Sequence, residues 1–194
     1  MNIYSSSQFD EIIEELKNGN TIAFGTDTVF GLACDIDNEK AINKVYSQKK
    51  RDFSKKLPMM FSNIEMMGKY VEISEKAGKL ISKFSPGPIT YILKKKGLNE
   101  TLACRIPNDN WIIELIERYK KPLFVTSANI SGQKPLYKYE EVIKELKEVD
   151  VIVKKDANGN EASTIVDVVN NFNILREGPI TQKEIEDVIS ENII

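Results

Sequence analysis

Residues 21–32, with the sequence TIAFGTDTVFGL, combine a short apolar run with a segment of small and polar residues. The run from Thr21 to Phe24 predicts a buried strand, because short apolar runs next to a turn signal are typical of one. Gly25 to Leu32 would then form a loop at the carboxyl end of that strand. Ligands of α/β proteins bind at such loops, which supply hydroxyls and backbone donors.

Helical and strand patterns alternate on both sides of this stretch. The preceding helix would present Phe9 and Leu16 on one face, with Ser6 or Ser7 as its cap and Gly19 at its end. Further helices are expected from about residue 38 and at 75–84, 111–119, 139–147 and after the Thr181–Glu184 capping box. Further strands are expected at 57–61, 89–93, 102–106, 123–126, 149–153, 165–169 and 174–175, the last two as a hairpin around 170–171.

This alternation predicts a single α/β domain over residues 1–194, with a twisted mixed β-sheet flanked by helices. No internal repeat and no linker rich in Pro, Gly or Ser divides the chain. The segment 154–162, KKDANGNEA, is predicted to be a mobile loop.

The amino-acid composition excludes several classes of catalytic and metal site. The chain has 194 residues and a net charge of −2. It contains no histidine, and this absence excludes Ser-His-Asp catalysis, Cys-His catalysis and imidazole-based zinc sites. The longest apolar stretches reach only about six residues, too short to span a membrane. Cys34 and Cys104 are widely spaced and are predicted to be reduced thiols of a cytoplasmic protein. Chemistry is therefore expected to rely on carboxylates, hydroxyls, cations and backbone donors.

The sequence contains three segments of small and polar residues, at 25–32, 126–132 and 163–164. It also contains four candidate cationic residues for a binding site, which are Lys49, Arg51, Arg105 and Arg176. Arg105 interrupts an apolar strand, so it needs an anionic partner, either a protein carboxylate or a ligand. Arg176 follows another strand and has Glu177 beside it. Lys49 and Arg51 end a helix, where cations also suit the helix dipole. These features predict an anion-binding domain and leave the reaction open.

Seven blocks of sequence point to a family. They are GTDTVFGLA at 25–33, KKR at 49–51, SPGPIT at 85–90, CRIP at 104–107, TSANISG at 126–132, STIVD at 163–167 and LREG at 175–178. In this order they resemble the motifs of YrdC-type threonylcarbamoyl-AMP synthases, in the short single-domain form. Gly25, Phe30 and Ala33 depart from the proline, tyrosine and glycine of the family pattern, and Phe30 lacks the hydroxyl of that tyrosine.

The resemblance implies a YrdC-like fold with a concave basic face that binds ligands. It implies an enzyme that joins L-threonine, bicarbonate and ATP into threonylcarbamoyl-AMP and pyrophosphate, with Mg²⁺ carried by ATP and no metal site of its own. By matching position, L-threonine would be held by Thr28, Met60, Arg105, Val125 and Ser163. ATP would be held by Lys49, Arg51, Lys55, Thr101, Ser127, Asn129, Leu136 and Arg176. The product would pass to a tRNA-modifying threonylcarbamoyl transferase complex, and the enzyme could bind RNA directly.

Two other functions fit parts of the sequence. The cationic segment 49–56 could belong to an RNA-binding module without catalysis, although only Tyr46 and Phe53 lie near it for base stacking. Carbamoyl-adenylate chemistry, as in hydrogenase-maturation proteins, would use a related domain. Those proteins usually carry acylphosphatase and zinc-finger parts that this chain lacks.

Overall fold

The computed structural model describes residues 1–190, and its strands form one mixed sheet in the order β1-β8-β2-β3-β7-β4-β6-β5-β9-β10. The strands are β1 (Asn2–Ser5), β2 (Ile22–Gly25), β3 (Phe30–Asp35), β4 (Met59–Met60), β5 (Ile89–Lys94), β6 (Thr101–Arg105), β7 (Leu123–Ser127), β8 (Val151–Lys154), β9 (Thr164–Asp167) and β10 (Asn173–Arg176). The helices are α1 (Phe9–Lys17), α2 (Glu39–Lys49), α3 (Ile64–Met67), α4 (Glu75–Phe84), α5 (Asn110–Tyr119), α6 (Tyr139–Glu145) and α7 (Gln182–Ser190).

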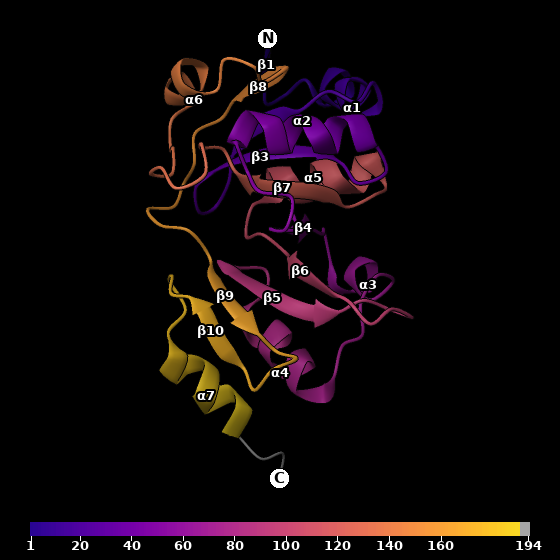
Figure 1. The fold of residues 1–194 in the computed structure, drawn as a ribbon, viewed down its shortest axis with the longest axis vertical. Coiled ribbons are helices and arrows are strands. Elements are labelled where there is room, and N and C mark those ends of the chain that lie inside the picture. Colours follow the sequence, from indigo (N-terminus) through magenta and orange to yellow (C-terminus); the bar gives the residue numbers. More distant parts are fainter. Residues whose placement is uncertain (191–194) are drawn as a thin grey trace.

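The sheet is mixed, as predicted. Strands β1, β2 and β8 pair in parallel, and so do β4 with β6 and β5 with β9. The remaining neighbours are antiparallel. The two-residue strand β4 joins the halves of the sheet, which extend toward opposite ends of the elongated molecule (Figure 1).

The first half of the sheet carries helices on both faces, because side chains alternate along its strands. Phe24 of β2 packs with α1 and α5, whereas its neighbour Ala23 packs with α2 and α6. Figure 1 shows α2 in front of the strands of this half. Burial on both faces explains why β2 and β3 are buried at every position.

The second half carries helices on one face only. Tyr91, Cys104 and Val166 pack against α4 and α7. The alternate positions Thr90, Ala103 and Arg105 line a cavity on the opposite face. The uncovered face of β5, β6 and β9 is therefore the floor of the candidate site.

Several local predictions are confirmed. Helices α2 and α4 begin where they were expected, after the capping side chains of Asn38 and Ser74, and Thr181 and Glu184 form the expected reciprocal bonds at the start of α7. The turn between β9 and β10 includes Asn171 with a positive φ of 60°, a conformation that asparagine tolerates.

Other predictions were wrong in detail. Helix α1 begins after Gln8, which makes no side-chain cap bond, so Ser6 and Ser7 do not cap it. Residues 30–32 belong to strand β3 rather than to a loop, and β1 and α3 were not expected. In segment 154–162, Lys154 ends β8. The rest of the segment is a loop, as predicted, in which the backbone N–H groups of Ala157 and Asn158 donate to the carbonyls of Tyr137 and Thr26.

Candidate active site

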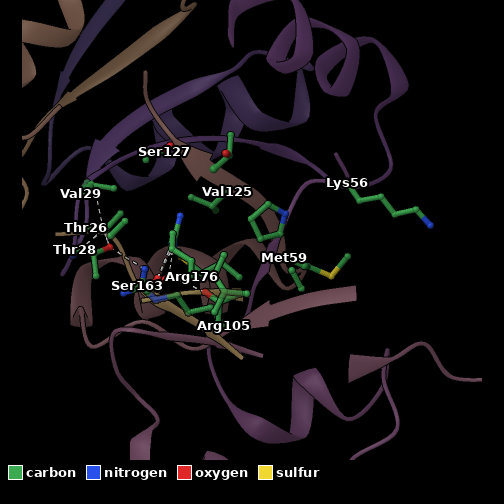
Figure 2. Close-up of a pocket in the computed structure, with 18 of the residues that line it drawn as sticks. Thr26, Thr28, Val29, Lys56, Met59, Arg105, Val125, Ser127, Ser163 and Arg176 are labelled. Carbon is green, nitrogen blue, oxygen red and sulfur yellow. Dashed lines mark hydrogen bonds between the residues drawn. The ribbon is translucent and has the colours of Figure 1, made fainter. Parts of the chain in front are cut away.

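A cavity of about 300 Å³ opens between the two halves of the sheet. Its lining comes from the β2–β3 turn, the segment 51–60, strands β5, β6, β7 and β9, and Leu175 and Arg176 of β10. In Figure 2, Val125 and Ser127 lie on one side of the cavity, and Arg105, Ser163 and Arg176 lie together on the other. The side chains of Arg105 and Arg176 thus lie across the cavity from Val125 and Ser127.

Hydroxyl groups shape the turn between β2 and β3. The Oγ1 of Thr26 donates to the carbonyl of Val29 at 2.7 Å and accepts from the backbone N–H of Thr28 at 3.0 Å. Because the Thr26 proton is thereby used, the hydroxyl of Thr28 donates to Thr26 Oγ1 at 3.0 Å. The turn therefore presents Thr28 to the cavity in a fixed orientation.

Gly25 lets another segment pack against this turn. A Cβ at Gly25 would lie 2.1 Å from the backbone carbon of Asp156, so only glycine fits here. Lys155 fixes the same segment, since its Nζ donates to the Gly25 carbonyl at 2.9 Å and pairs with Asp109 at 2.5 Å. The departure from the proline of the family pattern is thus matched by the close approach of residues 155–157.

Arg105 is buried, with 6% of its surface exposed. Its Nε donates to the Gly87 carbonyl at 3.1 Å, its Nη1 to Thr28 Oγ1 at 2.8 Å and its Nη2 to Asp27 Oδ1 at 2.8 Å. The expected anionic partner is therefore a protein carboxylate. Burial lowers the pKa of Arg105, and the nearby Asp27 opposes that effect.

Arg176 reaches the cavity through an irregularity in β10. The pairing of β10 with β9 shifts between Ile174 and Arg176, which places Arg176 opposite Ile165 on the cavity face. Its guanidinium donates to the Ser163 carbonyl at 2.7 and 2.9 Å and to Ser163 Oγ at 3.0 Å. Burial and then the charge of Arg105 lower the pKa of Arg176.

Ser163 connects these groups to the floor of the cavity. Its Oγ lies 2.9 Å from Thr90 Oγ1 on β5. Thr90 belongs to the SPGPIT block but was not assigned a role from the sequence, because nothing in the sequence shows that β5 and β9 are neighbours.

Arg51 and Lys56 also line the cavity, and Figure 2 shows Lys56 well apart from Arg105, Ser163 and Arg176. Arg51 is held by its own loop, since its Nε and Nη2 donate to the carbonyls of Lys55 and Lys56 at 2.8 and 3.1 Å. Lys56 Nζ pairs with Glu100 at 2.9 Å. Lys55 was expected to contact ATP, but its neighbour Lys56 is the residue that lines the cavity, and the side chain of Lys56 points away from the other labelled residues in Figure 2.

Lys49 was expected to add charge near phosphates and does not line the cavity. It is 1% exposed, and its ammonium group donates to the carbonyls of Ser127 and Asn129. The carbonyl of Lys49 accepts from Ser131 N–H at 2.8 Å. Burial, followed by the charge of Arg51, lowers the pKa of Lys49 to about 7. In this structure Lys49 fixes the loop 127–131 rather than facing a ligand.

The structure brings most of the expected residues together around the cavity: Thr28, Arg51, Met60, Arg105, Val125, Ser127, Ser163 and Arg176. Lys49, Lys55, Thr101, Asn129 and Leu136 are not among the lining residues. Thr101 is exposed at the start of β6, and Leu136 offers its carbonyl to Phe30 N–H at 2.7 Å. Asn129 is buried, and its Nδ2 donates to the carbonyls of Ile130 and Gln133.

Within residues 1–190 no group of three or more His, Cys, Asp or Glu side chains could hold a metal ion. Over the same range no helix is long and apolar enough to cross a membrane. Cys34 and Cys104 are both buried and unpaired, as predicted.

Residues 14–178 match the protein-family model Sua5_yciO_yrdC, whose description is telomere recombination. The chain belongs to the Sua5/YciO/YrdC family. A member from Methanocaldococcus jannaschii, named putative threonylcarbamoyl-AMP synthase, is 39% identical over 86% of this chain and 84% of its own. Another from Photorhabdus laumondii, named threonylcarbamoyl-AMP synthase, is 33% identical over 81% of this chain and 89% of its own.

One solved structure of a similar protein contains L-threonine. P. abyssi Sua5 complexed with L-threonine superposes with a TM-score of 0.90 and 27% identity. The match covers 98% of this chain and 62% of the Sua5 chain, so this chain spans about three fifths of that relative.

Proposed function

We propose that this protein is an L-threonylcarbamoyl-AMP synthase. L-threonine and bicarbonate form a carbamate on the threonine nitrogen with loss of water. One carbamate oxygen then attacks the α-phosphorus of ATP, the bond from that phosphorus to the β-phosphate bridging oxygen breaks, and pyrophosphate leaves. The products are threonylcarbamoyl-AMP and pyrophosphate.

The observation that carries the proposal is the convergence of Arg105 and Arg176 on one cavity that Arg51 and Lys56 also line. Arginine pairs with carboxylates and phosphates through two parallel N–H donors. The cluster of Arg105, Thr28 and Ser163 suits the carboxylate of an amino acid. The part lined by Arg51, Lys56 and Ser127 suits a triphosphate.

The proposed chemistry needs no side-chain base, which agrees with a chain that contains no histidine. A carbamate oxygen is already anionic, so no proton has to be removed from the nucleophile when it attacks. The protein must hold two anions together and stabilise charge on the phosphate oxygens in the transition state. Positioning and fixed cationic donors serve both purposes.

ATP would enter as its magnesium complex. Mg²⁺ keeps several waters and is commonly held by substrate phosphates together with one or two carboxylates. We propose that the ion is held by the phosphates and stays part of the substrate.

The product would be consumed by a tRNA-modifying threonylcarbamoyl transferase complex in the cytoplasm. A mixed anhydride of a carbamate and a phosphate is prone to hydrolysis, which favours direct transfer to such a partner.

For direct contact with RNA we propose the loop 50–56. Its Phe53 is 66% exposed and stacks on Tyr46, and Lys50 and Lys55 lie in the same loop.

Pyrophosphate release tests the function. It should require ATP, Mg²⁺, L-threonine and bicarbonate together, because the nucleophile is assembled from two of them. Release should fall to background when any one is omitted, with bicarbonate removed by degassing. Robust ATP cleavage in the absence of threonine would refute the proposal.

A further inference from the structure

Asp27 is a largely buried carboxylate beside the candidate site, and no role was assigned to it from the sequence. Its side chain is 10% exposed. Its Oδ1 accepts from Arg105 Nη2 at 2.8 Å, and its Oδ2 accepts from the backbone N–H of Asn108 at 2.9 Å. Both carboxylate oxygens are therefore bonded, one to the candidate threonine-binding arginine and one to the chain just before α5.

The location of this carboxylate is electrostatically unfavourable for the proposed substrates. The carboxylate of threonine, the carbamate and ATP are anionic, and a carboxylate near their site repels these groups more strongly in a poorly solvated cavity than in water. An uncharged acceptor at position 27 would give a more positive site. The carboxylate must therefore contribute something other than attraction.

Asp27 contributes by fixing the orientation of the Arg105 guanidinium. A guanidinium has five N–H donors in a fixed plane. Arg105 uses three of them on Gly87, Thr28 and Asp27, and among the residues that the structure describes no further acceptor is recorded for the other two. Three acceptors from three segments fix both the position and the plane of the group. The direction of the two remaining N–H bonds is then fixed as well.

The turn that carries Asp27 packs against the loop that contains Gly159. A Cβ at Gly159 would lie 2.6 Å from the Asp27 carbonyl oxygen and 2.4 Å from that of Thr28, so the loop after β8 packs directly on this backbone. Asp27 cannot shift easily without displacing that loop.

We propose that Asp27 is a positioning residue. It holds the guanidinium plane of Arg105 so that the two remaining N–H donors face the carboxylate of L-threonine. This inference rests on the proposed function, because it takes Arg105 to bind threonine. It adds that threonine affinity depends on a side chain that does not line the cavity.

The test is steady-state kinetics of Asp27→Asn, with threonine and ATP varied separately. The amide keeps the size of the side chain, but its NH₂ group faces either Arg105 or Asn108, both of which are donors, so the pair must rearrange. The KM for threonine should rise roughly tenfold, as for loss of one charge-assisted hydrogen bond. The KM for ATP and kcat at saturating threonine should change by less than about twofold.

Asp35→Asn is the matched control. Asp35 is also 10% exposed and ion-paired, to Lys121 at 2.9 Å, and it is not among the residues that line the cavity. It should lower the free energy of unfolding without changing either KM. Loss of a buried carboxylate by itself would affect both variants alike.

Asp27→Glu keeps the charge but displaces the carboxylate by one methylene. Its threonine KM should rise severalfold while its ATP KM stays unchanged, because displaced positioning groups weaken catalysis and binding. This variant decides the question if Asp27→Asn does not fold. An unchanged threonine KM in the folded variant, or equal rises for both substrates, would overturn the inference. Threonine-independent turnover of the wild type would instead refute the proposed function.

Discussion

Replacing Arg105 with lysine keeps its positive charge and removes its planar fork. The wild-type side chain donates to three acceptors, Gly87, Thr28 and Asp27, from three different nitrogens. A lysine has a single nitrogen and a different reach, so it can stay with Asp27 but not also satisfy the other two in the same geometry. The substitution is therefore not conservative at this position.

Two quantities follow from this geometry. Threonine binding should weaken by about 1.5–3 kcal/mol, the range for a hydrogen bond to a charged group. That corresponds to a loss of roughly 10- to 150-fold in affinity. The free energy of unfolding should fall by about 1–3 kcal/mol, because at least one buried acceptor loses its donor. The binding of MgATP should change little, since Lys56, in the part of the cavity proposed for ATP, lies well apart from Arg105.

Calorimetric titration of threonine and of MgATP into the folded variant measures both affinities, and urea unfolding measures stability. Arg118→Lys is the control, because Arg118 is half-exposed on α5 and pairs with Glu114. It should leave both affinities unchanged and shift stability by at most about 0.5 kcal/mol. If Arg105→Lys weakens the two ligands equally, or neither, the assignment of Arg105 to threonine is wrong.

Three further predictions use other parts of the molecule. Arg51→Ala should weaken ATP binding and largely spare threonine, which the same titrations would show; a selective loss of threonine binding would contradict it. Replacing Cys34 and Cys104 with alanine should leave kcat largely intact in a folded protein, because both thiols are buried and the proposed reaction forms no bond to the enzyme; complete loss of turnover in a stable variant would indicate covalent catalysis. Burial lowers the pKa of Lys49 to about 7 from 10.5, so between these pH values the unfolded chain binds a proton that the native state lacks. The free energy of unfolding should therefore rise with pH over this window in the wild type relative to Lys49→Met, and parallel pH profiles of the two proteins would contradict the shift.

Much of the fold could be predicted because local signals agreed with one another. Helix α4 shows this, since Ser74 caps it, the apolar face of Ala77, Leu80 and Ile81 is regular, and the segment after Phe84 ends it. Strand β3 was missed for a physical reason. It is buried on both faces, so it has no alternation, and the turn that precedes it uses the same small and polar residues that are typical of loops.

The site was less predictable than the fold. Arg105 could be singled out because a charge inside an apolar strand needs a partner, but the partner lies 78 residues away and the sequence does not name it. Lys49 and Lys55 matched family positions, yet their orientation depends on which backbone carbonyls and cavity walls lie nearby. Arg176 reaches the cavity only because β10 is irregular, a feature without a clear sequence signal.

Mass analysis of the nucleotide product is the direct test of threonylcarbamoyl-AMP synthase activity. The protein would be incubated with MgATP, L-threonine and ¹³C-labelled bicarbonate, and the products separated at once to limit hydrolysis. We expect pyrophosphate and an adenylate whose mass equals that of threonylcarbamoyl-AMP with one ¹³C atom. Formation of ADP and phosphate alone, or of an adenylate that lacks the labelled carbon, would contradict it.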